Sequence, residues 1–222
     1  MANPILKSTE QAGVYEIPGA GKITLKEWRE DSFYDCVQVG NASSNTQVSA
    51  GAKLYLFRDI TSKNLPHTNL KVPRRIPAGS KLILTRIGLA VDQIVGLTVQ
   101  KLADIMFIMY GASFTFRLNT RLVAQGPAIH FPSGLGVQGS TTENNVSVAT
   151  SGVPSVAAAP TMMVAQPVTS NDDLDAELSF DDDAWLSGNA SATAGTLYPM
   201  TLSNKPVVRC VLHGFISKPM GQ

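Results

Sequence analysis

Charged side chains are scarce in this sequence, because Lys, Arg, Asp and Glu together make up 16% of its 222 residues. Soluble domains usually carry about a quarter. The formal net charge is +1, which gives no overall attraction to the phosphates of nucleic acid. Hydrophobic content is ordinary at 44%, so the chain can bury a core. Much of the polar surface is therefore uncharged, which is typical of surfaces that meet other protein.

Cysteine is scarce as well, and the two residues present, Cys36 and Cys210, form no metal-binding framework. We interpret them as buried thiols of a reducing compartment. Long hydrophobic runs are also missing. Residues 1–11 contain no signal-peptide core, and the most apolar window, residues 102–112, is too short to span a membrane. The length favours one large domain.

The scarcity of charge is greatest between Ala124 and Ser170, where Glu143 is the single charged side chain in 47 residues. Ordering this backbone costs on the order of 50 kcal/mol, at about 1 kcal/mol per residue. The small side chains of the stretch cannot easily offset that cost against their own domain. We therefore expect a long loop insertion that is ordered by neighbouring subunits, with a floppy Ser/Ala-rich insertion as the alternative.

Alternation of apolar and polar side chains predicts a chain built mainly from β-strands. The expected strands are residues 53–60, 81–89, 114–122, 174–180 and 206–217, with 33–39 and 162–166 as weaker candidates. Residues 94–109 fit a helix or a strand equally well. Many strands with long irregular connections favour an all-β fold, an antiparallel jelly-roll β-sandwich.

The first 35 residues look separate from this β region. Thr24-x-x-Glu27 matches a capping box, which predicts a short helix through Trp28. We therefore expect an N-terminal extension with a short helix over residues 1–35 and a jelly-roll domain over residues 36–222. The uncharged loop insertion of residues 124–170 falls within that domain.

The sequence contains no convincing motif for catalysis or for a cofactor. Gly134-Leu-Gly136-Val-Gln-Gly139 has the glycine spacing of a dinucleotide site, but no helix follows it and no acid lies about 20 residues on. Gly19-Ala-Gly21-Lys22 lacks the first glycine and the hydroxyl residue of a phosphate-binding loop. Cys210 and His213 would lie on opposite faces of a strand, so they cannot share a zinc ion. We expect no enzyme, with no catalytic, cofactor-binding or metal residues and no cofactor.

Charge is unevenly distributed along the chain. Residues 53–86 hold eight bases and one acid, whereas residues 172–183 hold seven acids and no base. In a monomer these are solvated faces, and in an assembly they could be complementary edges that set the register between neighbours. The acidic run could also supply oxygen ligands for Ca²⁺, although it lacks the glycine of an EF-hand. Arg74-Arg75 could contact phosphate, but we interpret the pair as a salt-bridging surface element.

Several segments between residues 50 and 220 follow one another in a particular order. They are Ile76-Pro-Ala-Gly-Ser-Lys81 leading into Leu82–Leu89, then Phe114–Asn119, Gly126-Pro127, Phe131–Gly134 and Val207–Ile216 with Pro219 behind it. Their order resembles that in the single jelly-roll capsid proteins of tailless icosahedral bacteriophages with an internal membrane. The resemblance implies two facing four-stranded sheets, several subunits per capsomer, no catalytic residue and no cofactor.

The resemblance further implies a structural virion protein that self-assembles into an icosahedral capsid shell. A major capsid protein is the first interpretation, and a minor, vertex or decoration protein stays open. The implied partners are other copies of itself in capsomers, other capsid proteins, and the internal membrane or genome at the inner face of the shell, with no small-molecule substrate. The protein would be made in the host cytoplasm and reside in the virion. The alternative is a glycan-binding or glycan-acting β-sandwich domain, with Trp185, beside Asp181–Asp183 and Gly188, as its sugar platform.

Overall fold

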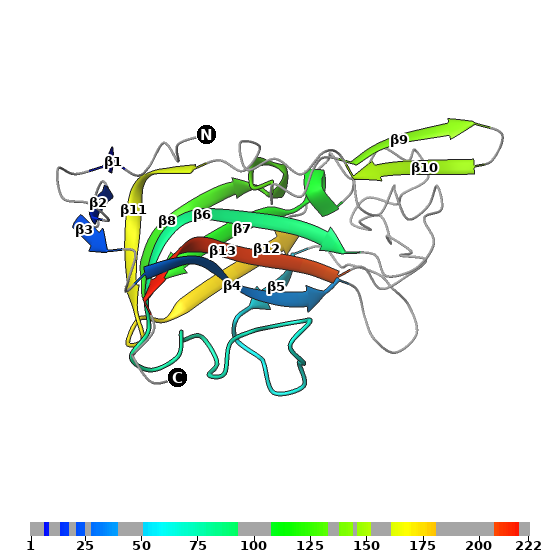
Figure 1. Cartoon of the computed structure of the whole chain (residues 1–222). Coiled ribbons are helices and arrows are strands. Elements are labelled where there is room, and N and C mark those ends of the chain that lie inside the picture. Colours follow the sequence, from blue (N-terminus) through cyan, green and yellow to red (C-terminus); the bar gives the residue numbers. More distant parts are fainter. Residues whose placement is uncertain are drawn as a thin grey trace.

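The chain forms two four-stranded antiparallel sheets that pack face to face (Figure 1). The computed structural model describes residues 7–8, 14–17, 21–24, 28–39, 51–92, 108–132, 138–143, 146–151, 161–180 and 207–217. One sheet has the strand order β11-β6-β13-β4 and the other the order β5-β12-β7-β8. The strands are β4 (Trp28–Gln38), β5 (Ala52–Leu56), β6 (Lys81–Asp92), β7 (Ser113–Leu118), β8 (Arg121–Pro127), β11 (Thr161–Thr169), β12 (Leu174–Phe180) and β13 (Val207–Ser217). The expected all-β sandwich is confirmed.

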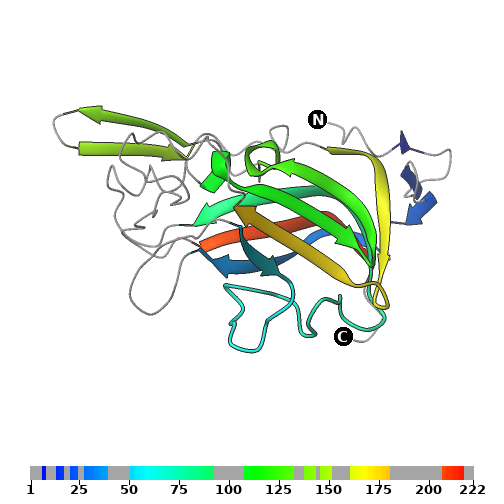
Figure 2. The same ribbon diagram turned by 180° about the vertical axis from the view of Figure 1, so that it is seen from behind.

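Smaller elements flank the sandwich. They are a three-stranded sheet of β1 (Lys7–Ser8), β2 (Val14–Ile17) and β3 (Gly21–Thr24), a hairpin of β9 (Gln138–Glu143) and β10 (Val146–Ser151), and the 3-10 helix η1 (Ala128–His130). The β9–β10 hairpin extends beyond one end of the sandwich, and the β1–β3 sheet lies at the other end (Figures 1 and 2). Among the described residues, no helix has the length and apolar character needed to cross a membrane.

The eight strands of the sandwich pair in a nested order. The first strand, β4, pairs with the last, β13, and the second, β5, pairs with the seventh, β12. The third, β6, pairs with the sixth, β11, and β7 pairs with the strand that follows it, β8. The contacts β13–β6 and β12–β7 then join these pairs into the two sheets. The chain therefore has the pairing of one long hairpin that is wound over itself.

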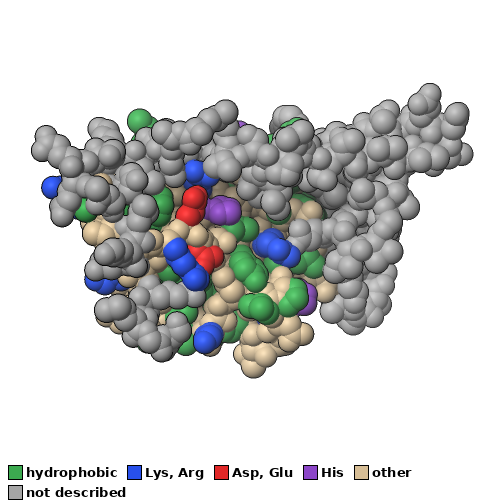
Figure 3. Space-filling view, in the orientation of Figure 1, with side chains coloured by type: hydrophobic (Ala, Val, Ile, Leu, Met, Phe, Trp, Pro, Cys, Tyr) green, Lys and Arg blue, Asp and Glu red, His purple; other side chains and the backbone are tan. Residues whose placement is uncertain are grey.

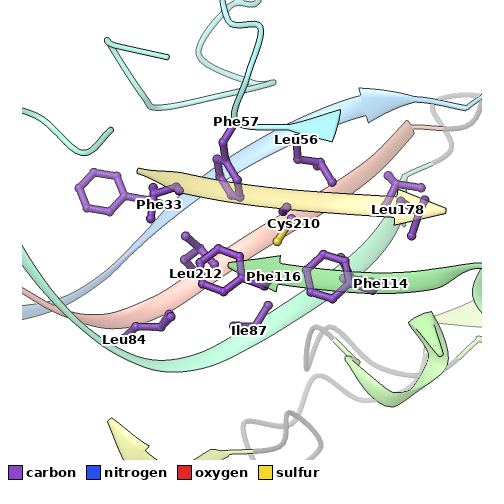
Figure 4. Close-up of a cluster of buried hydrophobic side chains, with 14 of the residues drawn as sticks. Phe33, Leu56, Phe57, Leu84, Ile87, Phe114, Phe116, Leu178, Cys210 and Leu212 are labelled. Carbon is purple, nitrogen blue, oxygen red and sulfur yellow. The ribbon is translucent and has the colours of Figure 1, made fainter. Parts of the chain in front are cut away.

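The core lies between the two sheets and is formed by alternate side chains of their strands. Every second residue of β12, from Leu174 to Phe180, is buried, as its sequence pattern predicts. Figure 4 shows Phe114 and Phe116 of one sheet facing Ile87 and Leu212 of the other. Burying a side chain of this size stabilises the fold by about 1.5–3 kcal/mol. The core is therefore large enough to hold the sandwich together.

The predicted helix at the N-terminus is wrong. Thr24 ends β3 and Trp28 begins β4, so no helix runs through Trp28. Residues 28–35 pair along β13 as part of an 11-residue strand, and the boundary expected between residues 35 and 36 falls inside that strand. The physical reason is that a capping pattern constrains only one turn, whereas β4 makes cross-strand contacts along its whole length.

The predicted strand over residues 114–122 is in fact a hairpin of two strands. β7 ends at Leu118 and β8 begins at Arg121, because the chain turns at Asn119, which has a φ of 56°. Asparagine is one of the few residues that adopt this left-handed conformation readily. Leu122, which the alternation places in the core, is 51% exposed.

The uncharged stretch of residues 124–170 contributes β11 and part of β8 to the sandwich, so it is not only an insertion. Residues 121–127 form β8 and residues 161–169 form β11, and each is one edge strand of its sheet. Of the weaker strand candidates, residues 162–166 lie in β11, and residues 33–38 lie in β4. Most of the ambiguous segment 94–109 lies outside the described residues.

Candidate interaction surface

The basic region and the acidic run meet within a single subunit. The ion pairs that join them or their neighbours are Arg58–Asp175 at 2.8 Å, Lys53–Glu177 at 2.9 Å, Arg75–Asp173 at 3.0 Å, Arg117–Glu177 at 3.7 Å and Arg74–Asp175 at 3.8 Å. The interpretation of Arg74-Arg75 as a salt-bridging element is confirmed. These acids and bases neutralise one another inside the chain, whereas the sequence suggested that they could set the register between neighbours. Residues 181–183 lie outside the described part.

Asp175 is the centre of this network. The guanidinium of Arg58 donates to both of its oxygens, at 2.8 and 3.1 Å. That hydrogen bond and the nearby charges of Arg58, Arg74 and Arg117 lower the pKa of Asp175, although burial opposes the shift. Within the described part of the chain, no group of three or more His, Cys, Asp or Glu could hold a metal ion. The network is therefore a stabilising contact between β12 and the segment after β5.

Asp175→Asn is expected to lower the free energy of unfolding by about 1.5–3 kcal/mol near pH 7, because a charged hydrogen bond is lost. A lowered pKa stabilises the fold above the unfolded value, and this contribution disappears as the pH falls through the folded value. The difference between the variant and the wild type should therefore shrink below about pH 4. Urea unfolding at several pH values measures it, with Asp59→Asn as a matched control on an exposed loop. A difference that stays constant down to pH 2 would contradict this account.

Cys210 and His213 lie on opposite faces of β13, as the strand pattern predicts. Cys210 is in the core, and burial raises the pKa of its thiol well above the usual value. His213 is half-buried on the outer face, between Ser32 of β4 and Arg86 of β6. Burial and the charge of Arg86 lower the pKa of His213, against the opposing effect of Glu30. Figure 3 shows acidic, basic and histidine side chains gathered on this face.

Asp35 is a buried acid that the sequence patterns did not single out. It lies at an inward position of β4 with its side chain fully buried. Its oxygens accept from Nζ of Lys63 at 2.9 and 2.8 Å, and one accepts from the backbone N–H of Phe57 at 2.6 Å. Phe57 has a φ of 67°, which is strained for a bulky residue, so the carboxylate holds a sharp bend after β5. The signal in the sequence is an acid between the inward residues Phe33 and Val37.

The segment that follows this bend is hydrogen-bonded to the middle of the free edge of β4. Asn69 accepts from the backbone N–H of Tyr34 at 2.9 Å and donates to the carbonyl of Ser32 at 2.8 Å. Thr68 donates from its hydroxyl to the carbonyl of Tyr34 at 3.0 Å. An unpaired strand edge is a template for a further strand, and these hydrogen bonds occupy part of that edge. We call residues 60–70 the β4 strap. Figure 1 shows the segment below β4 and β5.

The opposite side of the sandwich, where β8 and β11 are the edge strands, contains an open groove of about 380 Å³. The groove is lined by Ile87, Val123, Ala124, Phe131, Met162, Met163, Val164 and Gln166. The guanidinium of Arg121 in β8 donates to the side-chain oxygen of Gln166 in β11. The side-chain nitrogen of Gln166 donates to the carbonyl of Val164 at 3.0 Å. The polar side chain of the lining is thus already engaged on both of its polar atoms.

Large apolar side chains are exposed on both of these edge strands. Met163 and Val164 of the groove lining are 96% and 54% exposed, and Leu122 of β8 is 51% exposed. We call the groove together with these three residues the β8–β11 surface. Exposed apolar side chains that gather in this way mark interaction sites, and burying each of them would contribute about 1.5–3 kcal/mol.

No protein-family model matches the chain, and comparisons with curated proteins and with solved structures give no match either. The functional argument therefore depends on the residues and on the fold.

The described residues among the others singled out from the sequence do not line this groove. Gly139 lies in β9, a strand, whereas a dinucleotide site requires a helix there. Trp28 is half-buried against a small cluster that includes Ile17 and Ile23. The proposed sugar platform at Trp185 lies outside the described residues. The arrangement that the structure does describe is suited to binding another apolar protein surface.

Proposed function

We propose that this chain is a structural virion protein that self-assembles into an icosahedral capsid shell, as a major capsid protein. The observation that carries the proposal is the nested pairing of eight strands in two facing four-stranded sheets. A sandwich with eight strands wound in this way fits a jelly roll, a fold found in viral capsid proteins and in lectins. The sequence resemblance supports the same assignment.

Because one fold serves several functions, the surface must decide between them. A ligand pocket needs a few polar groups placed to orient its ligand. The groove of the β8–β11 surface instead has apolar walls, and its glutamine is held by Arg121 and by the carbonyl of Val164. An exposed apolar edge of this kind favours protein assembly over recognition of a sugar.

Under this proposal the partners are other copies of the chain in capsomers, other capsid proteins, and the internal membrane or genome at the inner face. The protein resides in the virion, and it acts by shape and contact, without a substrate or cofactor. The ion pairs within the subunit fit this role, because the charges of β5, β7 and β12 have partners inside the chain and need none from a neighbour.

Native mass spectrometry and electron microscopy of the purified chain test the proposal. We expect oligomers or closed particles whose abundance rises with protein concentration. They should persist in about 1 M salt, where charges are screened beyond about 3 Å, because the contact is apolar. A strictly monomeric chain at every protein and salt concentration would contradict the proposal.

A further inference from the structure

We propose that the β8–β11 surface is a two-fold contact between copies of this chain, in which Met163 of each copy enters the β8–β11 groove of the other. The inference depends on the proposed self-assembly and identifies one contact through which it occurs. It goes further because it names the side chain that inserts and the cavity that receives it.

The protruding side chain and the groove belong to the same surface. Met163 is almost fully exposed, and its neighbours Met162 and Val164 line the groove. An interface about a two-fold axis uses the same patch on each subunit. Two copies that face each other in this way can therefore place each Met163 side chain in the groove of the other copy. Methionine suits the inserting role, since its unbranched thioether adapts to an irregular apolar cavity.

The charge of the surface allows it to meet its own copy. In a two-fold contact a patch faces itself, so a patch with a net charge would repel its partner. Among the described residues beside the groove, Arg121 carries a charge, and this charge is attracted to that of Asp172. Its guanidinium also donates to the neutral side chain of Gln166. From Ala124 to Ser170 the sequence adds a single formal charge. The β8–β11 surface therefore carries little net charge that would repel its own copy.

The backbone of β11 favours side-chain insertion over the addition of a strand. Pro167 has no N–H to donate to a new neighbour. The pairing of β11 with β6 shifts register between Thr161 and Gln166, so the ladder is irregular at Met163. The carbonyl of Val164 already accepts from the side chain of Gln166. Contact between copies at this edge is therefore made by side chains.

Sedimentation velocity of the full chain tests the inference with three variants. Met163→Asp removes the inserting side chain, and Ala124→Trp fills the groove while keeping Met163. Leu65→Asp is the matched control, because Leu65 is also exposed, at 71%, but lies in the β4 strap. Burying one methionine side chain contributes about 1.5–3 kcal/mol, which raises an association constant about tenfold or more. The two-fold contact buries two such side chains. We expect the first two variants to weaken self-association by about a hundredfold and the control to leave it unchanged.

A second measurement separates this contact from a loss of folding. Thermal unfolding monitored by circular dichroism should be unchanged in Met163→Asp, because the side chain is exposed in the single subunit. In the wild type, peroxide should oxidise Met163 to the sulfoxide several-fold more slowly at concentrations where copies associate.

The outcomes distinguish this contact from the proposed shell. Wild type that assembles, together with a Met163→Asp variant that assembles equally well, overturns the contact and leaves the shell standing. Wild type that forms a two-fold pair and nothing larger, lost in Met163→Asp, supports the contact and contradicts the shell. A monomeric wild type overturns both, as does native mass spectrometry that finds a monomer with a small apolar molecule bound in the groove.

Discussion

Asp35→Ala is expected to lower the free energy of unfolding by about 3–5 kcal/mol, because it breaks a buried ion pair and leaves one partner uncompensated. The ammonium of Lys63 would lose its carboxylate, and the backbone N–H of Phe57 would lose its acceptor. Phe57 would then no longer be held in its strained left-handed conformation. Chemical denaturation measures the change, and the bend after β5 should become accessible to proteases.

Two further variants separate the charge from the hydrogen bond. Asp35→Asn keeps an acceptor for Phe57 and should be less destabilising than Asp35→Ala. Lys63→Met leaves the buried carboxylate of Asp35 without its cation. The double variant with Asp35→Asn should lose less free energy of unfolding than the sum of the two single variants, because the two removed charges interact. A change below about 1 kcal/mol in Asp35→Ala, the usual size of a surface effect, would contradict the account.

Gly214→Ala is expected to lower the free energy of unfolding by about 4 kcal/mol or more, a size seen only when packing is severely disrupted. A Cβ atom on Gly214 would lie 2.0 Å from the carbonyl oxygen of Ile83 and 2.8 Å from its carbon. Both atoms belong to the backbone, so they cannot move aside as a flexible side chain could. The close approach occurs where β13 and β6 shift register, between His213 and Gly214.

Gly126→Ala is the matched control for this prediction. Its added Cβ would meet only the side chains of His130 and Phe131, both at 3.7 Å, an ordinary contact distance. It should change the free energy of unfolding by less than about 1 kcal/mol, measured by the same denaturation experiment. Equal effects at Gly126 and Gly214 would contradict this account, because Gly126 lacks the close approach to backbone atoms.

Local patterns predicted most of the strands and few of their connections. Strand β12 could be predicted over residues 174–180, because the alternation of apolar and polar side chains lies within the strand itself. The hairpin between β7 and β8 was missed, although Asn119 is a residue type that favours turns. The nested pairing of first strand with last depends on contacts between distant residues, so no local pattern contains it.

Little of the β8–β11 surface could be predicted from the sequence. The low charge of residues 124–170 predicts a contact with other protein, and this stays a prediction. It gave no sign that β11 and part of β8 arise from the same stretch. Met163 and Ala124 meet at one groove only because β8 and β11 lie at the same side of the sandwich. The uneven charge could not be interpreted from sequence, because whether Asp175 pairs within the chain depends on where Arg58 lies.

The β4 strap also bears on where a second copy could add a strand. With Asn69 and Thr68 bonded to the edge of β4 at Tyr34, a new strand cannot pair with β4 along its middle. Under the proposed two-fold contact, β8 and β11 are occupied by the partner copy as well. The sheet β11-β6-β13-β4 then has both of its edges engaged, and β5 remains as the other edge strand of the second sheet. Growth of the proposed assembly beyond a pair would therefore use β5 or the faces and ends of the sandwich, and not the continuation of the first sheet from copy to copy.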